Sequence, residues 1–353
     1  MLNEEFWASQ RVLLTGHTGF KGSWMSLWLE KLGAETFGFA LPPDQAPSLY
    51  ANIAPVARLQ SIIGDLRDLD AVAEAVRAAR PTVVIHMAAQ PLVRRSYRDP
   101  LQTWATNLSG SVHLLEALRA SPDLKAVLVV TTDKVYRHSG PAHAFSEQDG
   151  LGGHDPYSAS KAAVEVATES YAQSYFDPKG IPVATARAGN VLGGGDWSED
   201  RLGPDVWRAA KSGEPIVLRY PDATRPWQHV LDPVAGYLIF VEHLVHDAAR
   251  TPRALNFGPD ERSPDLTVKE VVEALAAPLG ASRSWTRAEG PQPKEMENLT
   301  LDVRKAMKTL NWRPKLATAD ALAWTAEWYR RFDRGESART LVREQIERFE
   351  SLP

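Results

Sequence analysis

Short apolar stretches alternate with helical patterns along the first half of the chain. Most of these stretches are continuous, which is typical of strands buried on both faces of a parallel sheet, because a strand with one solvent-facing side would alternate. They are RVLLTG, AETFGFAL, SIIGD, TVVIHMAA, AVLVVTT and VATARAGNV. The helical patterns between them cover residues 20–32, 69–80, 101–119 and 157–174. This alternation predicts a doubly wound α/β domain.

The pattern changes near Gly193. The segments GGGDWSEDRLGP and RYPDATRPWQH are rich in Gly, Pro, Asp and Arg, and the regular alternation ends there. Helical patterns recur at residues 206–212, 233–246, 268–279 and 319–331. We expect one domain over residues 1–190, to which later segments return, and a smaller mixed α/β lobe formed mainly by residues 191–353.

Composition narrows the classes of function. The 353 residues are 44% hydrophobic and 24% charged, with a net charge of -4, which is ordinary for a globular protein and gives no basic face for nucleic acid. Cysteine is absent, so disulfides, zinc-thiolate sites and thiol nucleophiles are excluded, and we expect no metal site. The acidic start MLNEEFWASQ and the lack of a long apolar run predict a cytoplasmic protein without a membrane span.

A glycine-rich loop, TGHTGFKGSW, joins the first expected strand to the first expected helix. Gly16, Gly19 and Gly22 recur every three residues, a pattern that permits a tight turn, close approach of the backbone to a pyrophosphate, and packing of helix on sheet. A plain strand-to-helix turn is the alternative. We therefore expect the first domain to bind a dinucleotide.

Two polar motifs are candidates for chemistry. The stretch TTDKVY follows AVLVV and delivers Thr132, Asp133 and Lys134 at the end of a buried strand, where an Asp-Lys pair capping a turn is the alternative. YSASK places Tyr157 and Lys161 four residues apart, hence on one helical face. A nearby ammonium lowers the pKa of a phenol, so this pair is suited to exchanging a proton with a substrate hydroxyl.

Together, TGHTGFKG, TTD and YSASK resemble the extended branch of the short-chain dehydrogenase/reductase superfamily. The ordered segments MAAQPLVRRSY, TTDKVY, DPYSASK, RAGNVLGGGDW, RPWQHV and NFGP, spread over some two-thirds of the chain, resemble the sugar-nucleotide 4,6-dehydratases, especially those that act on CDP-glucose. The resemblance implies a Rossmann-type sheet with a C-terminal substrate-binding lobe. It also implies a nucleotide-sugar substrate, a homodimer or dimer of dimers, and a role in deoxysugar biosynthesis such as that for lipopolysaccharide O-antigen.

The resemblance also implies the cofactor and the residues that hold it. The cofactor is NAD, although the second strand ends Phe39-Ala40-Leu41, without a carboxylate or a basic residue, so the sequence does not exclude NADP. The implied cofactor-binding residues are Gly16, Thr18, Gly19, Phe20, Gly22, Asp65, Leu66, Ala88, Ala89, Tyr157 and Lys161. Asp65 would also suit a helix N-cap.

Substrate-binding residues follow from the same resemblance. They are Gln90, Asn190, Asp196, Trp197, Arg201, Arg225, Trp227 and His229. Arginine suits a pyrophosphate because its fork bonds two oxygens at once. Trp227 and His229 would equally suit a hydrophobic core, so both interpretations stay open.

The implied reaction oxidises C4, removes water across C5 and C6, and returns the hydride to C6. The dehydratases that act on TDP-glucose carry Thr-Asp-Glu where this chain has Thr132, Asp133 and Lys134. Asp133 matches the acid that protonates the departing hydroxyl. Lys134 is either the base for the C5 proton or a charged stabiliser of the enolate. Alternative functions are a dehydratase of TDP-glucose or UDP-N-acetylglucosamine, and a non-enzymatic NAD(P)-sensing regulator.

Overall fold

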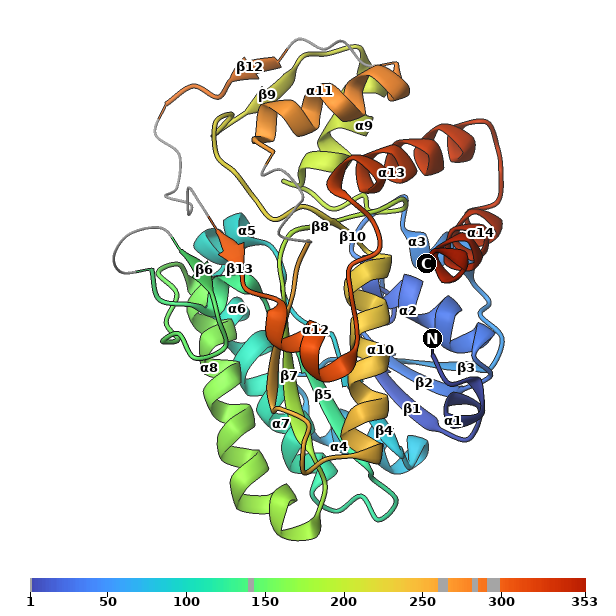
Figure 1. Ribbon diagram of the computed structural model, residues 1–353, viewed down its shortest axis with the longest axis vertical. Coiled ribbons are helices and arrows are strands. Elements are labelled where there is room, and N and C mark those ends of the chain that lie inside the picture. Colours follow the sequence, from blue (N-terminus) through green and yellow to red (C-terminus); the bar gives the residue numbers. More distant parts are fainter. Residues whose placement is uncertain (1, 139–142, 260–265, 281–284, 291–298) are drawn as a thin grey trace.

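A seven-stranded parallel sheet forms the centre of the molecule (Figure 1). The computed structural model describes residues 2–138, 143–259, 266–280, 285–290 and 299–353. The strand order is β11-β7-β5-β4-β1-β2-β3. The strands are β1 (Arg11–Thr15), β2 (Glu35–Ala40), β3 (Leu59–Ile63), β4 (Val83–His86), β5 (Ala126–Val130), β7 (Val183–Ala188) and β11 (Ala254–Phe257). The predicted α/β class with a doubly wound sheet is confirmed.

Helices cover both faces of this sheet, which explains the continuous apolar runs. Successive residues of a strand point to opposite faces: Val12 and Leu14 belong to one hydrophobic core cluster and Leu13 to another. The first cluster includes residues of α1 (Glu4–Ala8), α2 (Phe20–Lys31), α3 (Leu49–Ile53), α10 (Leu231–His246), α12 (Arg304–Leu310) and α14 (Ala338–Ser351), together with three buried aromatic residues of α13 (Thr318–Asp333). Helices of the second are α4 (Leu69–Ala79), α7 (Gly110–Leu118) and α8 (Pro156–Tyr171). Every residue of β4, β5 and β7 is buried.

Two predicted helices contain π-helical segments. The helix expected over residues 101–119 consists of α6 (Pro100–Trp104), a π-helical turn at Ala105–Ser109, and α7. The helix expected over residues 157–174 is α8, followed by a π-helical turn at Ala172–Phe176 and a short 3₁₀ turn at Asp177–Lys179. Apolar periodicity does not reveal a single π turn, because one turn is too short to establish a period of its own.

A smaller lobe of helices and short strands stands above the sheet in Figure 1. Its third core cluster joins α9 (Leu202–Ser212), α11 (Val268–Leu279) and α13 (Thr318–Asp333). The short parallel pairs are β8 (Val191–Leu192) with β10 (Gln228–His229), β9 (Ile216–Leu218) with β12 (Trp285–Arg287), and β6 (Ala144–Phe145) with β13 (Thr300–Leu301). The predicted mixed α/β second lobe is therefore present.

The chain passes between the sheet domain and the second lobe more than once. The helix expected at residues 233–246 as part of the second lobe is α10, which packs against the sheet and α2. Strand β11, which follows it, pairs with β7 at the sheet edge. The division near residue 190 stays a prediction. Among the described residues, no helix has the length and apolar character that crossing a bilayer requires.

The first turn of α10 holds a buried carboxyl group. Asp232 is 0% exposed; its Oδ1 accepts a hydrogen bond from the backbone N of Lys315 at 2.7 Å, and its backbone oxygen accepts one from Trp312 Nε1 at 3.2 Å. Asp232 Oδ2 is buried without a partner in the part of the chain described. Burial raises the pKa of Asp232 to about 7, against the opposing backbone hydrogen bonds. The Asp232 carboxyl group thus joins α10 to the segment that leads into α13.

We predict that Asp232→Asn changes how stability depends on pH. The folded-state pKa lies above the unfolded value of 3.8, so the stabilisation is present below about pH 4 and is lost as pH rises through about 7. Asparagine does not titrate. The free energy of unfolding of the variant relative to the wild type should therefore rise by on the order of 3 kcal/mol between pH 4 and pH 8. Urea titrations at several pH values measure this, and a difference independent of pH would contradict it.

Candidate active site

The polar segment after β5 leaves the sheet in one 3₁₀ turn, Asp133–Val135. Thr132 precedes this turn; its Oγ1 donates to Asp133 Oδ1 at 2.9 Å and accepts from the backbone N of Lys134 at 3.4 Å. Lys134 Nζ donates to Asp133 Oδ1 at 3.1 Å and to Asn190 Oδ1 at 3.2 Å. Three of the predicted catalytic residues therefore lie together, and Asn190, predicted for the substrate, joins them.

One carboxylate oxygen of this cluster lacks a protein partner. Asp133 is 0% exposed, and its Oδ2 is buried with no hydrogen-bond partner among the described residues. A Cβ atom on Gly189 would lie 3.3 Å from this oxygen and 2.7 Å from Pro226, so the backbone passes close by. An unpaired buried oxygen costs free energy, and a bound ligand at a site that holds other polar groups is one way to satisfy it. Asp133 is thus placed to contact a bound polar group.

Helix α8 brings Tyr157 and Lys161 to the same edge of the sheet. Their side chains are buried, and Lys161 Nζ donates to the carbonyl oxygen of Val130 at 3.1 Å. Burial lowers the pKa of Lys161 to about 8. Burial also raises the pKa of Tyr157 to about 12, although the nearby Thr132 side chain opposes this rise. The direction for the phenol is opposite to that expected from the ammonium alone, because loss of hydration of the phenolate outweighs it.

The glycine loop forms a cradle at the start of α2, whose first residue is Phe20. Gly16 has φ +79°, and a Cβ there would lie 2.7 Å from the backbone N of Ala88; a Cβ on Gly22 would lie 2.0 Å from the Gly16 oxygen. At Gly19, the N-cap, the nearest atom to an added Cβ would be the Gly16 oxygen at 3.4 Å. No side chain caps α2, so its first N–H groups are available to an anion. The loop therefore fits a dinucleotide pyrophosphate.

Asp65 and Leu66 follow β3 at the same edge. The Asp65 carboxylate binds the guanidinium of Arg67, with Nε–Oδ distances of 3.0 and 2.9 Å. The N-cap of α4 is Asp68, which accepts from the first backbone N–H groups of that helix, so Asp65 does not serve as the cap. Leu66 is buried beside Gly110, where a Cβ would lie 2.8 Å from the Leu66 side chain. Asp65 thus remains partly exposed at the cofactor edge.

Thr18, Ala88 and Ala89 lie around the loop. Thr18 Oγ1 donates to the carbonyl oxygen of Leu41 at 2.8 Å, which ties the glycine loop to the end of β2. The backbone N of Ala88 donates to Thr15 Oγ1 at 3.2 Å. Ala88 and Ala89 are both partly exposed after β4. The predicted cofactor residues therefore gather where β1, β2, β3 and β4 end.

Gln90 is held by a network inside the protein. Its amide Nε2 donates to Thr103 Oγ1 at 2.9 Å, and its Oε1 accepts from the backbone N of Leu92 at 2.6 Å. Its backbone N donates to Asn107 Oδ1 at 2.8 Å, and Asn107 Nδ2 donates to Ser160 Oγ at 2.9 Å. Asn107, in the π-helical turn, therefore links the chain after β4 to the YSASK helix. The sequence interpretation missed it, although a buried Asn within an apolar helical pattern is a usable signal.

The predicted substrate residues of the GGGDWSEDR loop fall into two environments. Arg201 Nη1 donates to Asp196 Oδ2 at 3.3 Å, and the charge of Arg201 acts on Tyr157. Asp196 is buried, and its backbone oxygen accepts from the Tyr329 hydroxyl. Trp197 is buried in an aromatic cluster with Trp207, Trp328, Tyr329 and Phe332. Arg201 and Asp196 thus lie toward the catalytic groups, whereas the Trp197 indole packs within the second lobe.

The RPWQHV segment is largely buried. His229 is 0% exposed between the rings of Trp24 and Trp324, each at 5.8 Å, and burial lowers its pKa to about 3. Trp227 is buried in the third core cluster, and its indole N donates to the oxygen of Leu266 at 3.3 Å. Arg225 is also buried and donates to a neighbouring backbone oxygen at 2.7 Å. The structure places Trp227 and His229 in packing positions.

A lysine of the glycine loop lies among the predicted catalytic groups. Lys21 Nζ lies 5.7 Å from the ring centroid of Tyr237. Burial lowers the pKa of Lys21 to about 7. The charges that act on it are those of Arg201, Lys161, Asp133 and Lys134. In the sequence, Lys21 is a single charged residue in the first turn of a helix whose large side chains are mostly apolar. The sequence interpretation did not select it.

Arginines from both lobes converge on the loop after Trp197. Asp200 Oδ1 accepts from Arg94 Nη1 of α5 (Val93–Arg98) at 3.2 Å and from Arg219 Nη1 at 3.3 Å. Glu199 binds Arg98 at 2.6 Å. Asp200 has φ +56°, an uncommon conformation for a residue other than glycine. These ion pairs tie the loop that carries Arg201 to both lobes.

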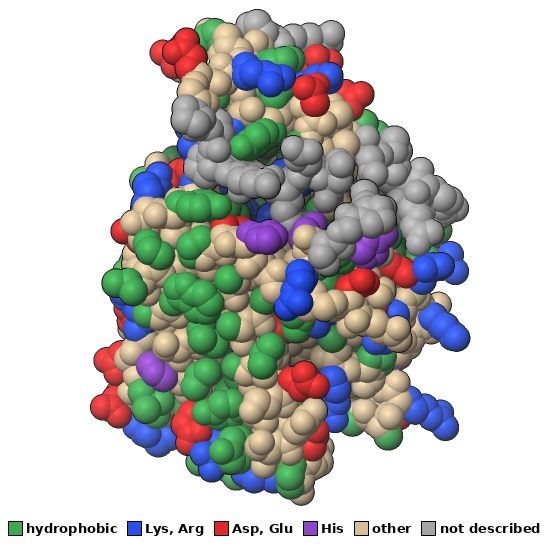
Figure 2. Space-filling view, turned by 90° about the vertical axis from the view of Figure 1, so that its left-hand side faces the viewer, with side chains coloured by type: hydrophobic (Ala, Val, Ile, Leu, Met, Phe, Trp, Pro, Cys, Tyr) green, Lys and Arg blue, Asp and Glu red, His purple; other side chains and the backbone are tan. Residues whose placement is uncertain are grey.

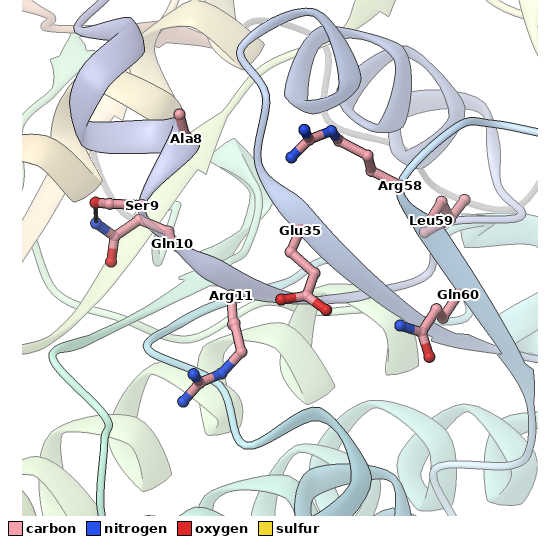
Figure 3. A pocket seen from close by; sticks show the side chains of 8 residues that line it. All are labelled: Ala8, Ser9, Gln10, Arg11, Glu35, Arg58, Leu59 and Gln60. Atoms are coloured by element: carbon pink, nitrogen blue, oxygen red, sulfur yellow. Dashed lines mark hydrogen bonds between the residues drawn. The ribbon is translucent and has the colours of Figure 1, made fainter.

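A shallow pocket lies at the opposite edge of the sheet, where β1, β2 and β3 begin (Figure 3). Its lining includes Gln10, Arg11 and Arg58. Gln10 Nε2 donates to the oxygen of Phe6 at 2.8 Å, and Arg11 Nη2 pairs with Asp123 at 2.8 Å. These polar groups are satisfied within the protein, so the pocket does not indicate a second site. Nor do the described residues bring three His, Cys, Asp or Glu side chains together as a metal site would require.

A glycine cradle, a doubly wound parallel sheet and a buried Tyr157–Lys161 pair beside Asp133 define a dinucleotide-binding protein with a proton-transfer site. A family model described as the NAD dependent epimerase/dehydratase family matches residues 12–258. The chain belongs to this family, and the predicted relationship is confirmed.

Individual relatives cover nearly the whole chain. A CDP-glucose 4,6-dehydratase from Salmonella typhimurium is 39% identical over 341 residues, 95% of this chain and 95% of that protein. A dTDP-glucose 4,6-dehydratase from Xanthomonas campestris pv. campestris is 29% identical over 344 residues, 90% and 92% of the two chains. A crystal structure of dTDP-glucose 4,6-dehydratase from Bacillus anthracis in complex with NAD has a TM-score of 0.76 at 23% identity and covers 92% and 97%.

We predict that two glycines of the loop respond differently to alanine. In Gly19→Ala the added methyl meets only the Gly16 oxygen at 3.4 Å, so the protein should fold normally and bind NAD at least about tenfold more weakly. In Gly22→Ala the methyl would lie 2.0 Å from that oxygen, so the free energy of unfolding should fall by roughly 1–3 kcal/mol. Calorimetric titration measures the NAD affinity of each variant, and thermal melts measure its stability. Unchanged NAD affinity in Gly19→Ala would contradict the assigned cradle.

Proposed function

We propose that this protein is a CDP-glucose 4,6-dehydratase that converts CDP-glucose to CDP-4-keto-6-deoxyglucose. The observation that carries the proposal is the Asp133–Lys134 ion pair at the end of β5, beside Tyr157 and Lys161. It is supported by the full-length similarity to the Salmonella enzyme of that name. The glycine cradle, Asp65 and the Tyr157–Lys161 pair would hold NAD, which would accept the hydride from C4 of the sugar and return it to C6.

Different side chains of the protein carry out the separate proton transfers. Tyr157 takes the proton of the 4-hydroxyl, and the positive charges of Arg201 and of Lys161, one turn further along α8, favour the phenolate. The resulting ketone acidifies C5. Asp133, whose Oδ2 has no partner among the described residues, protonates the departing 6-hydroxyl.

Lys134 serves in this proposal as the charged stabiliser of the enolate. Its Nζ donates to two oxygens, Asp133 Oδ1 at 3.1 Å and Asn190 Oδ1 at 3.2 Å, which hold it beside the acid. A negative oxygen that develops at C4 when the C5 proton leaves is stabilised by such a cation. A protonated amine cannot accept the C5 proton, so in this proposal that proton passes to the Asp133 carboxylate, which delivers it to the departing 6-hydroxyl.

Arg201 and Arg225 are proposed for the substrate pyrophosphate. Arg201 lies near enough to act on both Tyr157 and Lys21, and the Asp200 ion pairs hold its loop. Asn190 and Asp196 are proposed for polar contacts to the sugar. Gln90, Trp197, Trp227 and His229 would shape the pocket through packing and internal hydrogen bonds. The alternative substrate TDP-glucose is less supported, because those relatives are 29% identical or less.

We propose a homodimer formed through the helices on the side that faces the viewer in Figure 2, where apolar side chains gather. Exposed apolar residues of α5, α6, α8 and the π-helical turn after α8 are Tyr97, Leu101, Val166 and Tyr175. Leu101 is 85% exposed and Val166 58%. Pairing of dimers, a cytoplasmic location and a role in lipopolysaccharide O-antigen synthesis stay predictions.

The substrate is tested by incubating the purified protein and NAD separately with CDP-glucose, TDP-glucose, UDP-glucose and UDP-N-acetylglucosamine. Mass spectrometry reports loss of water, and alkaline ultraviolet absorbance reports the ketosugar. We expect a dehydrated product from CDP-glucose. Dehydration of another sugar alone would reassign the substrate, and no reaction with any would favour a sensor function.

We predict that Asp133→Asn separates oxidation from dehydration. The amide keeps the shape but cannot supply a proton, so product formation should fall by at least about 100-fold while the cofactor is still reduced on addition of substrate. Tyr157→Phe should abolish both steps. Stopped-flow absorbance of the reduced nicotinamide and mass spectrometry measure them, with Asp177→Asn as a surface control. Normal product yield from Asp133→Asn would refute its role as acid.

We predict that Leu101→Glu weakens the dimer. A carboxylate buried in an apolar interface costs several kcal/mol, so the variant should be monomeric at micromolar concentration by light scattering. Val217→Glu, at a 60% exposed position on β9, is the matched control and should stay dimeric. A wild-type monomer, or a Leu101→Glu variant that remains dimeric, would exclude this interface.

A further inference from the structure

A buried carboxylate lies one turn beyond Lys161 on α8. Glu165 is 4% exposed, and its Oε1 accepts a hydrogen bond from Thr131 Oγ1. Its Oε2 accepts from Thr185 Oγ1 at 2.7 Å and from Arg187 Nη2 at 2.7 Å. Helix α8 is therefore bonded through one side chain to both β5 and β7.

The hydrogen bond to Thr131 lies between the contacts that orient the proposed catalytic groups. The residue before it, Val130, accepts the hydrogen bond of Lys161 through its carbonyl oxygen. The residue after it, Thr132, lies close enough to Tyr157 to oppose the rise that burial causes in the pKa of its hydroxyl, and it donates to Asp133 Oδ1 at 2.9 Å. A shift of β5 against α8 would disturb both contacts at once, and the carboxylate of Glu165 opposes such a shift.

Arg187 continues the network toward the Asp133–Lys134 turn. It is 5% exposed, its Nη1 donates to the Tyr136 hydroxyl at 2.9 Å, and its guanidinium lies 5.1 Å from the Tyr136 ring. The Tyr136 hydroxyl donates to Asn256 Oδ1 at 2.6 Å, in β11. Tyr136 directly follows the 3₁₀ turn that carries Asp133 and Lys134, so Arg187 holds the far end of that turn.

The charge of Glu165 also matters to Lys161. Among the described residues, the titratable groups coupled to Lys161 from neighbouring elements are Lys21 of α2 and His86 of β4. Burial keeps His86 neutral by lowering its pKa to about 3, and Lys21 contributes positive charge when protonated. Burial disfavours the ammonium of Lys161, and the negative charge of Glu165 on the same helix favours it.

We propose that Glu165 and Arg187 are positioning residues for the reaction: Glu165 keeps Lys161 charged and fixes β5 against α8, and Arg187 fixes the Asp133–Lys134 turn. The inference rests on the proposed function in that Lys161 and Asp133 act on substrate there. Neither Glu165 nor Arg187 was singled out in the sequence, because the helix and the two strands meet only in the folded chain.

The test measures the titration of Lys161 directly, without substrate. Protein with ¹³C-labelled lysine side chains is titrated by NMR, and the Lys161 signal is assigned by its loss in Lys161→Met. Wild-type Lys161 should titrate near pH 8. Glu165→Gln should lower this midpoint by about one pH unit or more, because an opposite charge is lost. Glu169→Gln, one turn further along α8 and exposed, is the matched control and should leave the midpoint unchanged.

Glu165→Gln leaves the Arg187 charge buried without its anion, which destabilises the fold independently of Lys161. The double variant Glu165→Gln/Arg187→Met removes both charges, and thermal melts establish that it is folded. It should show the same lowered midpoint. A folded variant lacking Glu165 that titrates as the wild type does would overturn the charge role.

Arg187→Lys tests the second half of the proposal. Lysine keeps the charge but cannot bond Glu165 and Tyr136 together through a planar fork. The Lys161 midpoint should stay near that of the wild type, kcat should fall at least about tenfold, and KM for CDP-glucose should change less than about threefold. An unchanged kcat would overturn the placement role. Because the Lys161 titration needs no turnover, failure of the proposed substrate would be distinguishable from failure of this inference.

Discussion

The site depends on the packing of α8 against the carboxyl ends of β5 and β7. A strand buried on both faces has no water to satisfy polar groups at its end, so each polar side chain there must find a protein partner or remain open to a ligand. Glu165 meets this demand for Thr131, Thr185 and Arg187. Asp133 Oδ2 has no hydrogen-bond partner among the described residues, and the proposed reaction uses this oxygen.

The second constraint is electrostatic. Lys21, Lys134, Lys161 and Arg201 bring positive charge to one small region, and Asp133 is the carboxylate among them. Such a concentration of cations is unfavourable when buried: burial first, and then the charges of Arg201, Lys161 and Lys134, lower the pKa of Lys21. It suits a site for a dianionic pyrophosphate and a developing enolate, because the ligand supplies the missing negative charge.

The GGGDWSEDR loop makes contacts that hold the two lobes together. Trp24 of α2 donates to the oxygen of Gly194 at 3.1 Å, and a Cβ on Gly194 would lie 2.0 Å from the Trp328 ring. Asp200 binds arginines of both lobes. These contacts make the GGGDWSEDR loop part of the wall between cofactor and substrate regions, so its glycines serve close packing as well as turns.

The sequence by itself determined the parallel sheet, the glycine cradle and the pairing of Tyr157 with Lys161, because each follows from short-range periodicity and spacing. The run VATARAGNV predicted β7, whereas the short ALNF of β11 and the transfer of α10 to the sheet required long-range packing. Only the tertiary structure decided that His229 and Trp197 lie in packed aromatic surroundings, that burial raises rather than lowers the pKa of Tyr157, and that Lys21 and Glu165 lie beside Lys161. Burial and the charges of residues distant in the chain are properties of the assembled fold, so no local pattern encodes them.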